Sequence, residues 1–140
     1  MTDQLNNRVA VTGASGHIGA NLVRELLGRG YEVVALVRNS YHALEGLDIQ
    51  RVHGDLSDLE CLRETFNGTA LVYHLAAHIT IQSGENKKLE QTNVEGTRNV
   101  LEACRLEGVA TLVYFSSIHA LKLEPLDQPV TEDNPLLGDR

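Results

Sequence analysis

Three regularly spaced glycines, Gly13, Gly16 and Gly19, occur in the segment TGASGHIG. They lie between an apolar run and a helical pattern, where glycine permits a tight turn, close approach of the backbone to a phosphate, and close packing of the helix. The N–H groups at the start of that helix would then face a pyrophosphate. The spacing departs from the commoner G-x-G-x-x-G, and a glycine-rich turn that binds nothing is the alternative. The pattern favours a dinucleotide site.

The residue after the second apolar run bears on which dinucleotide binds. In NAD-binding proteins a carboxylate roughly 20 residues beyond the glycines binds the adenosine ribose hydroxyls. Here Val37, Arg38 and Asn39 occupy that place, and none is acidic. Because a guanidinium can form paired hydrogen bonds with a 2′-phosphate, we expect NADP(H) to be preferred, with NAD(H) as the second choice. The alternative, a solvated surface Arg38, leaves the preference open.

Histidines and cysteines give no sign of a metal site. His74 and His78 are four residues apart but span the end of a predicted strand, where this spacing does not bring two ligands together. We expect a packed His74 and a loop His78. Cys61 and Cys104 each belong to a helical pattern on its apolar side, which favours buried free thiols over a disulfide.

Strands and helices alternate along the chain, and this alternation determines where the glycines, Arg38 and the other candidate residues lie. Apolar runs predict five strands, at residues 8–13, 31–38, 49–54, 69–77 and 110–117. Ile18, Leu22 and Leu26 predict a helix after the first strand. Two further helices are predicted by Leu59, Leu62 and Phe66, and by Val94, Thr97, Leu101 and Cys104 before Gly108. We expect Ser57 and Glu60 to form a capping box at the second helix.

Such alternation requires right-handed crossovers and therefore a parallel sheet with helices on both faces. The predicted fold class is α/β, a Rossmann-type doubly wound parallel sheet with strand order 3-2-1-4-5. Ligands of such sheets bind at the carboxyl ends of the strands. The functional residues should therefore lie there. The predicted ends are Thr12 to Gly13, Val37 to Arg38, Gly54 to Asp55, Leu75 to Ala77 and Phe115 to Ser117.

Five motifs in this order resemble the extended short-chain dehydrogenase/reductase family, which includes NAD(P)-dependent epimerases, dehydratases and dihydroflavonol-reductase-like enzymes. They are TGASGHIG, GDLSD, YHLAA, NVEGT and YFSS. The resemblance covers essentially the whole chain. It implies the cofactor-binding part of an NADP(H)-dependent oxidoreductase, epimerase or dehydratase that transfers hydride between nicotinamide and a carbonyl or secondary alcohol. A non-catalytic NADP-binding sensor or scaffold of the same fold is the alternative.

The resemblance also assigns roles. Asp55 would accept from the adenine amino group beside the Leu56 backbone, and Ala76 and Ala77 would leave room for the cofactor. Asn93 would lie near the site, or else bond a neighbouring loop. The cofactor-binding residues expected in full are Gly13, Ser15, Gly16, His17, Ile18, Gly19, Arg38, Asp55, Leu56, Leu75, Ala76, Ala77, Asn93 and Ser116.

In similar enzymes the last serine of this strand, here Ser117, binds the substrate oxygen, while a tyrosine acts as acid or base with a lysine four residues on. The alternative for both serines is a local backbone cap. No Tyr-x-x-x-Lys occurs, because Tyr31, Tyr41, Tyr73 and Tyr114 are followed at that distance by Ala35, Glu45, Ala77 and Ile118. We therefore expect the 140 residues alone to be inactive.

We interpret residues 1–118 as a dinucleotide-binding Rossmann domain and residues 119–140 as an irregular active-site segment that leads into an absent C-terminal portion. This tail carries all three prolines of the chain and has no helical or strand period. A natural short protein that forms a homodimer over its open sheet edge is the other interpretation.

Composition limits the partners. The net charge is −7 and the 12 basic residues are scattered, so nucleic acid is not expected as a partner. The family resemblance implies a small-molecule substrate. No apolar run approaches the roughly 18 residues of a membrane span. The N-terminus MTDQLNNR lacks the basic flank and apolar block of a secretion signal. We expect a cytoplasmic protein.

Overall fold

The computed structural model describes residues 7–39, 42–80, 84 and 86–138. Five parallel strands form one sheet, namely β1 (Arg8–Thr12), β2 (Glu32–Val37), β3 (Gln50–His53), β4 (Leu71–His74) and β5 (Thr111–Tyr114). Their order is β3-β2-β1-β4-β5, which confirms the predicted fold class and strand order. The order reverses beside β1, whose Val11 is in register with Ala35 of β2 and with Tyr73 of β4. Each strand is shorter than predicted because its last residues leave the sheet as loops, and every strand except β1 also begins one or two residues later than predicted.

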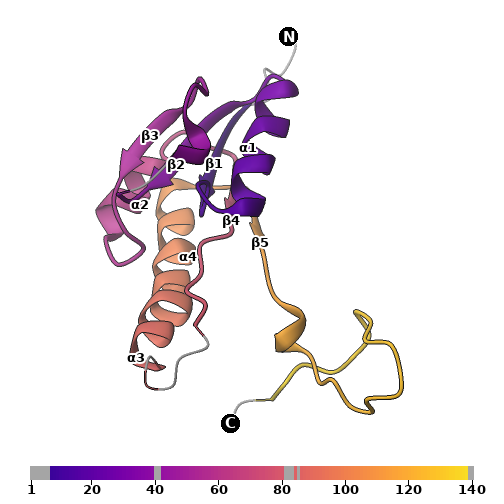
Figure 1. The fold of residues 1–140 in the computed structure, drawn as a ribbon. Coiled ribbons are helices and arrows are strands. Elements are labelled where there is room, and N and C mark those ends of the chain that lie inside the picture. Colours follow the sequence, from indigo (N-terminus) through magenta and orange to yellow (C-terminus); the bar gives the residue numbers. More distant parts are fainter. Residues whose placement is uncertain (1–6, 40–41, 81–83, 85, 139–140) are drawn as a thin grey trace.

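The helices cover both faces of this sheet (Figure 1). They are α1 (His17–Gly28), α2 (Leu59–Phe66), α3 (Asn86–Leu89), the π-helix η2 (Glu90–Glu95) and α4 (Gly96–Glu107), with 3₁₀ turns η1 (His42–Leu44) and η3 (Ile118–Ala120). Helix α1 covers one face, and α2 and α4 lie side by side on the other (Figure 1). Gly108 ends α4 in the left-handed region at φ 68°, as expected.

Side chains alternate between the two faces along the central strands. In β2, Val33, Ala35 and Val37 join the core under α1, whereas Val34 and Leu36 join the core under α2 and α4. The first core also contains Val9, Val11, Ala14, Ala20, Val23, Leu26 and Leu44, and the second contains Ala10, Val52, Leu56, Leu62, Phe66, Val72, Val100, Ala103 and Cys104. Because β1 and β2 are covered on both sides, their continuous apolar sequences are what the fold requires.

The predicted capping box at α2 is wrong. The helix begins at Leu59, and the carboxylate of Asp58 accepts from the Cys61 N–H at 3.0 Å. The Ser57 N–H instead donates to Asp55 Oδ1 at 3.0 Å, within the turn that precedes the helix. An aspartate one residue closer to the helix therefore performs the N-cap role.

Both cysteines are free, as predicted. Cys104 is buried, and burial raises the pKa of its thiol to about 11. Cys61 is half-buried, and its Sγ donates to the His53 carbonyl oxygen at 3.1 Å. Neither thiol is activated, because burial disfavours the thiolate that reacts.

Beyond β5 the chain forms η3 and then a loop closed by an isolated bridge between Leu121 and Leu136. This tail extends away from the sheet and its helices (Figure 1). Across the described part of the chain, no helix combines the length and the apolar character needed to cross a lipid bilayer.

Candidate functional site

The glycine loop connects β1 to α1 and packs tightly against the end of β4. Gly13 adopts φ 72°, and a Cβ there would lie 2.6 Å from the Ala76 nitrogen. A Cβ on Gly19 would lie 2.1 Å from the Gly13 carbonyl oxygen. The Gly16 N–H donates to the same oxygen at 3.1 Å. Gly13 and Gly19 therefore meet steric demands that no other residue type satisfies.

The start of α1 is open to a ligand. Gly16 is its N-cap, and no side chain forms a capping hydrogen bond there. Ser15, Gly16, His17 and Ile18 are all exposed. Over its 12 residues the helix dipole places partial positive charge at this end. The loop thus fits an anionic group such as a pyrophosphate, which would accept hydrogen bonds from the backbone without meeting a side chain.

A groove of about 260 Å³ begins at this loop and runs along the carboxyl ends of four strands. Nine predicted residues line it, namely Gly13, Ser15, Gly16, Arg38, Asp55, Leu56, Leu75, Ala76 and Ala77. The groove also includes five residues outside the predicted set, Leu36, Gly54, His78, Lys88 and Thr92. The structure therefore brings the glycine loop, the end of β2, the end of β3 and the end of β4 to one site.

Two predicted polar residues in the groove differ in their surroundings. Arg38 follows β2, is exposed, and makes no hydrogen bond or ion pair with the described residues. Asp55 follows β3 and holds its own loop through the bond from Ser57. The adjacent Leu56 buries its side chain, and its carbonyl oxygen accepts from Asn99 Nδ2 at 2.9 Å. The backbone beside a bound adenine would thus be fixed from the helix behind it.

Asn93 forms the loop bond that was the alternative to direct cofactor contact. Its Oδ1 accepts from the His78 N–H at 2.7 Å, and its Nδ2 donates to the His78 carbonyl oxygen at 2.9 Å. His78 lines the groove and lies in the loop, as predicted, whereas Asn93 does not line the groove. The amide therefore holds the β4 loop in place. Direct contact of Asn93 with a cofactor stays a prediction.

His74, predicted to be packed, is 1% exposed and connects three elements. Thr97 Oγ1 donates its hydrogen to the Asn93 carbonyl oxygen at 2.8 Å. It can therefore only accept from His74, whose Nε2–H donates to it at 3.1 Å. Nδ1 then carries no proton and accepts from Thr12 Oγ1 at 2.6 Å. Thr12 Oγ1 in turn accepts from the Ala76 N–H at 3.3 Å. The neutral Nε2–H tautomer satisfies every member of this chain.

Burial lowers the pKa of His74 to about 4, in agreement with the neutral ring that these hydrogen bonds require. The chain of bonds begins at Ala76, which lines the groove, and ends at Asn93, which holds His78. The position of the β4 loop is thus fixed by two sets of buried or half-buried hydrogen bonds.

The remaining predicted residues lie outside the groove lining. His17 and Ile18 form the exposed first turn of α1, and Gly19 is buried beneath the loop. Ser116 and Ser117 are exposed beyond β5. Ser117 Oγ accepts from the His119 N–H at 3.2 Å and caps η3, which is the local role considered as the alternative. A catalytic role for Ser117 stays a prediction.

Two of the five lining residues that sequence analysis missed come from the helical wall, and the other three lie in or just after strands. Lys88 on α3 and Thr92 on η2 are far from any strand end, so a search of strand ends does not reach them. Leu36 lies two residues before the predicted Arg38, and Gly54 lies directly before the predicted Asp55. Lys88 and Thr92 are polar, lie four residues apart and precede the motif NVEGT. Because positions four residues apart share a helix face, this spacing was the available signal for a polar helical wall.

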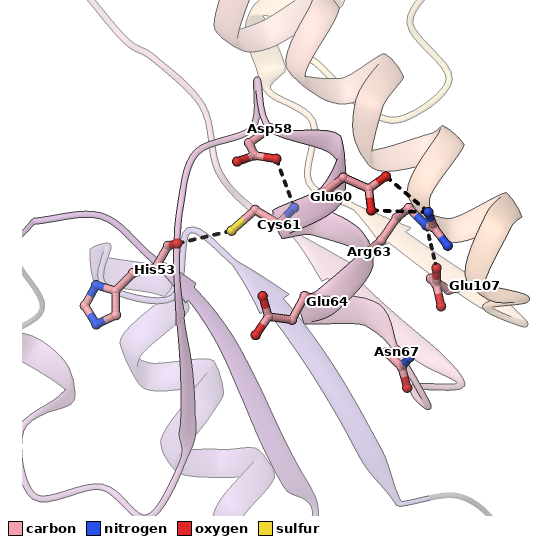
Figure 2. Close-up of a pocket in the computed structure, with 8 residues that line it drawn as sticks. All are labelled: His53, Asp58, Glu60, Cys61, Arg63, Glu64, Asn67 and Glu107. Carbon is pink, nitrogen blue, oxygen red and sulfur yellow. Dashed lines mark hydrogen bonds and ion pairs between the residues drawn. The ribbon is translucent and has the colours of Figure 1, made fainter.

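A second depression, of about 670 Å³, lies between α2, the end of β3 and the end of α4 (Figure 2). Its lining includes four carboxylates, on Asp58, Glu60, Glu64 and Glu107. Its one guanidinium, Arg63, is already paired with Glu60 at 3.1 Å and with Glu107 at 2.8 Å, as Figure 2 shows. This acidic lining would repel a dinucleotide. Within the ranges that the structure describes, no group of three or more His, Cys, Asp or Glu could hold a metal ion.

Comparison with known proteins agrees with the geometry. The sequence model of the NAD dependent epimerase/dehydratase family matches residues 9–137. Sterol demethylase protein B of Methylococcus capsulatus is 43% identical over 117 residues, which are 82% of this chain and 36% of that protein. The putative dihydroflavonol 4-reductase of Synechocystis is 42% identical over 113 residues, 79% of this chain and 33% of that protein.

Among solved structures, the UDP-glucose 4-epimerase of Thermus thermophilus in complex with NAD superposes with a TM-score of 0.80 at 32% identity. The match covers 93% of this chain and 44% of that one. The chain thus spans about a third of the length of the curated relatives it matches.

Proposed function

The chain belongs to the NAD-dependent epimerase/dehydratase family, and from this premise we propose that it forms the cofactor-binding part of an NADP(H)-dependent oxidoreductase, epimerase or dehydratase. The nicotinamide, when bound, supplies or accepts a hydride at a carbonyl or secondary alcohol of a small-molecule substrate. Residues 1–118 hold the dinucleotide, and residues 119–140 lead into the part that completes the active site.

The observation that carries this proposal is the packing of the glycine loop at the uncapped start of α1. Gly13 and Gly16 line the groove, and the α1 N–H groups are positioned to donate to a pyrophosphate. Asp55 and the Leu56 backbone bind the adenine. Ala76 and Ala77 line the groove with small side chains and so leave room for the cofactor backbone.

Arg38 supports the preference for NADP(H). It lines the groove, has no partner among the described residues, and follows β2 at the place where NAD-binding proteins carry a carboxylate. Its guanidinium can donate two parallel hydrogen bonds to a 2′-phosphate. A carboxylate at this position would instead accept from the ribose hydroxyls.

Ser117 orients the substrate oxygen in this proposal, and a longer polypeptide supplies the acid or base. Ser117 Oγ accepts from the His119 N–H when it caps η3, and it also lies 3.2 Å from His119 Nδ1. When the hydroxyl donates its hydrogen to that ring nitrogen, a second lone pair is left for another donor. Within this chain no tyrosine is followed four residues later by lysine. The proposal therefore assigns proton transfer to residues outside these 140.

Titration of the protein with NADPH and with NADH, measured by calorimetry, tests the proposal. We expect NADPH to bind more tightly than NADH, and Arg38→Asp to reverse that order by removing the 2′-phosphate contact and adding an acceptor for the ribose hydroxyls. Arg24→Asp controls for a general change of charge, since Arg24 bonds the Ala20 and Ala43 carbonyl oxygens and does not line the groove. Binding of neither nucleotide would refute the proposal.

Turnover separates the enzyme from the sensor or scaffold alternative. The longest natural polypeptide that carries this sequence should oxidise or reduce its bound nicotinamide when a substrate carbonyl or alcohol is supplied, and Ser117→Ala should slow it. Tight NADPH binding with no turnover on any tested carbonyl or alcohol would favour the sensor. A cytoplasmic location and a homodimer stay predictions.

A further inference from the structure

Lys88 lines the groove from a helix, whereas most of the lining lies at the ends of strands. It lies on α3, which continues directly into η2 and α4. Thr92, four residues on, also lines the groove, so this stretch of the helix presents one face to the site. Its neighbour Lys87 is equally exposed but does not line the groove.

The charges of the groove are unusual for this chain. Lys88 and Arg38 are its two basic residues of fixed charge, and Asp55 is its one carboxylate. Asp55 already accepts a hydrogen bond from Ser57, whereas neither cation has a partner among the described residues. In a protein of net charge −7, two unpaired cations in one groove favour an anionic ligand there.

We propose that Lys88 binds the 2′-phosphate of the adenosine ribose together with Arg38 and so strengthens the selection of NADP(H) over NAD(H). This inference rests on the proposed function, because it names a further residue for the same cofactor. A phosphomonoester carries a charge between about −1.5 and −2 at pH 7, which a single guanidinium cannot balance. The uncapped start of α1 serves the pyrophosphate, so the 2′-phosphate is the anion left without a second cation.

The two side chains suit different parts of this task. Arg38 offers a rigid planar fork that fits two phosphate oxygens. Lys88 lines the same groove from the helical wall and offers a compact charge on a flexible stem, which suits contact with a third oxygen. Arg38 without Lys88 would leave the groove lining with one fixed positive and one negative charge, and hence with a weaker attraction for a dianion.

The test uses the longest natural polypeptide that carries this sequence and compares Lys88→Gln with Lys87→Gln. Calorimetry gives the Kd for NADPH, NADH and adenosine 2′,5′-bisphosphate. We expect Lys88→Gln to raise the Kd for the two 2′-phosphorylated ligands about tenfold, the cost of losing one charged hydrogen bond. The Kd for NADH should stay unchanged, and Lys87→Gln should match the wild type throughout. Lys88→Arg keeps the charge and should keep the preference.

Equal losses for NADPH and NADH would place Lys88 on a part common to both nucleotides and overturn the inference. So would equal effects of the Lys88 and Lys87 substitutions. In either case wild-type binding of NADPH would leave the proposed function standing. Wild-type protein that binds neither nucleotide would overturn both.

Discussion

Gly19 shows how strongly one missing side chain can determine the position of a loop. It lies on the buried side of α1, where the helix passes over the Gly13 carbonyl oxygen. That oxygen also accepts from the Gly16 N–H, so it cannot move without loss of the turn. The close approach is between backbone atoms, which have no rotamer through which to relieve a clash.

We therefore expect Gly19→Ala to displace α1 from the loop and to weaken NADPH binding at least about tenfold, with a loss of about 1–3 kcal/mol in the free energy of unfolding. Gly28→Ala is the matched control, since it is on the same helix and a Cβ there meets no atom within 4 Å. That change should leave binding intact and stabilise the helix by up to about 1 kcal/mol. Calorimetry and urea denaturation measure both effects. Unchanged binding by Gly19→Ala would contradict this account of the loop.

At the scale of elements, the alternation of apolar runs with helical periods was enough to predict a parallel sheet, and the strand order came from its assignment to the Rossmann type. The helical periods predicted the buried side of α2, where Leu62 and Phe66 are fully buried, but only part of the buried sides of α1 and α4. Ile18 and Leu101 belonged to the repeats that predicted α1 and α4, yet they are 59% and 53% exposed. The buried faces of these two helices include small residues beside larger ones, such as Ala20 on α1 and Ala103 on α4. Close packing on a sheet favours such residues, which a search for large apolar side chains overlooks.

The candidate site was predictable to the same degree. Strand-end residues such as Arg38, Asp55 and Ala76 were found, because parallel strands bring their carboxyl ends to one edge. The helical wall with Lys88 was missed, because its approach to the groove depends on the path of the loop after β4.

The N-cap of α2 was misplaced for a related reason. Ser57 and Asp58 are both suitable caps by residue type, and in the structure Asp58 caps α2 whereas Ser57 belongs to the turn that Asp55 holds.

The hydrogen-bond chain through His74 joins β1, β4 and α4, and its neutral ring makes stability depend on pH. The pKa is about 4 in the folded protein and about 6.5 in the unfolded chain. Between these values the unfolded state binds more protons. The stabilisation is therefore fully present above pH 6.5 and is lost as the pH falls toward 4. From pH 7 to pH 5 we expect a loss of about 2 kcal/mol from this group.

Urea denaturation at several pH values measures this loss. His74→Gln should be less stable at pH 7, because it breaks the bonds to Thr12 and Thr97, but its stability should fall less steeply between pH 7 and pH 5. His17→Gln, at the exposed start of α1, should retain the wild-type slope. A His74→Gln protein with the full wild-type slope would show that other groups cause the acid sensitivity.

At the scale of the whole molecule, the sheet is covered unevenly. β1 and β2 are almost entirely buried, whereas every residue of β5 is partly or fully exposed. The chain that follows adds Phe115 at 39% exposure and Ile118 at 55%, and the tail then extends away from the sheet (Figure 1). Contiguous apolar surface next to an open sheet edge is a surface for association. Since the chain spans about a third of its curated relatives, we propose that further polypeptide covers β5.

This uneven covering predicts that residues 1–140 alone bind a dye for exposed apolar surface, such as ANS, and associate as their concentration rises. A polypeptide extended to the length of the relatives should do neither, because its additional residues would pack on β5. Ile118→Ser should reduce dye binding by the short form, whereas Ile79→Ser, 88% exposed in the loop after β4, should not. Fluorescence and sedimentation velocity measure these effects. A short form that stays monomeric without binding the dye would mean that β5 needs no cover, whereas a discrete dimer would favour pairing of two copies through this edge.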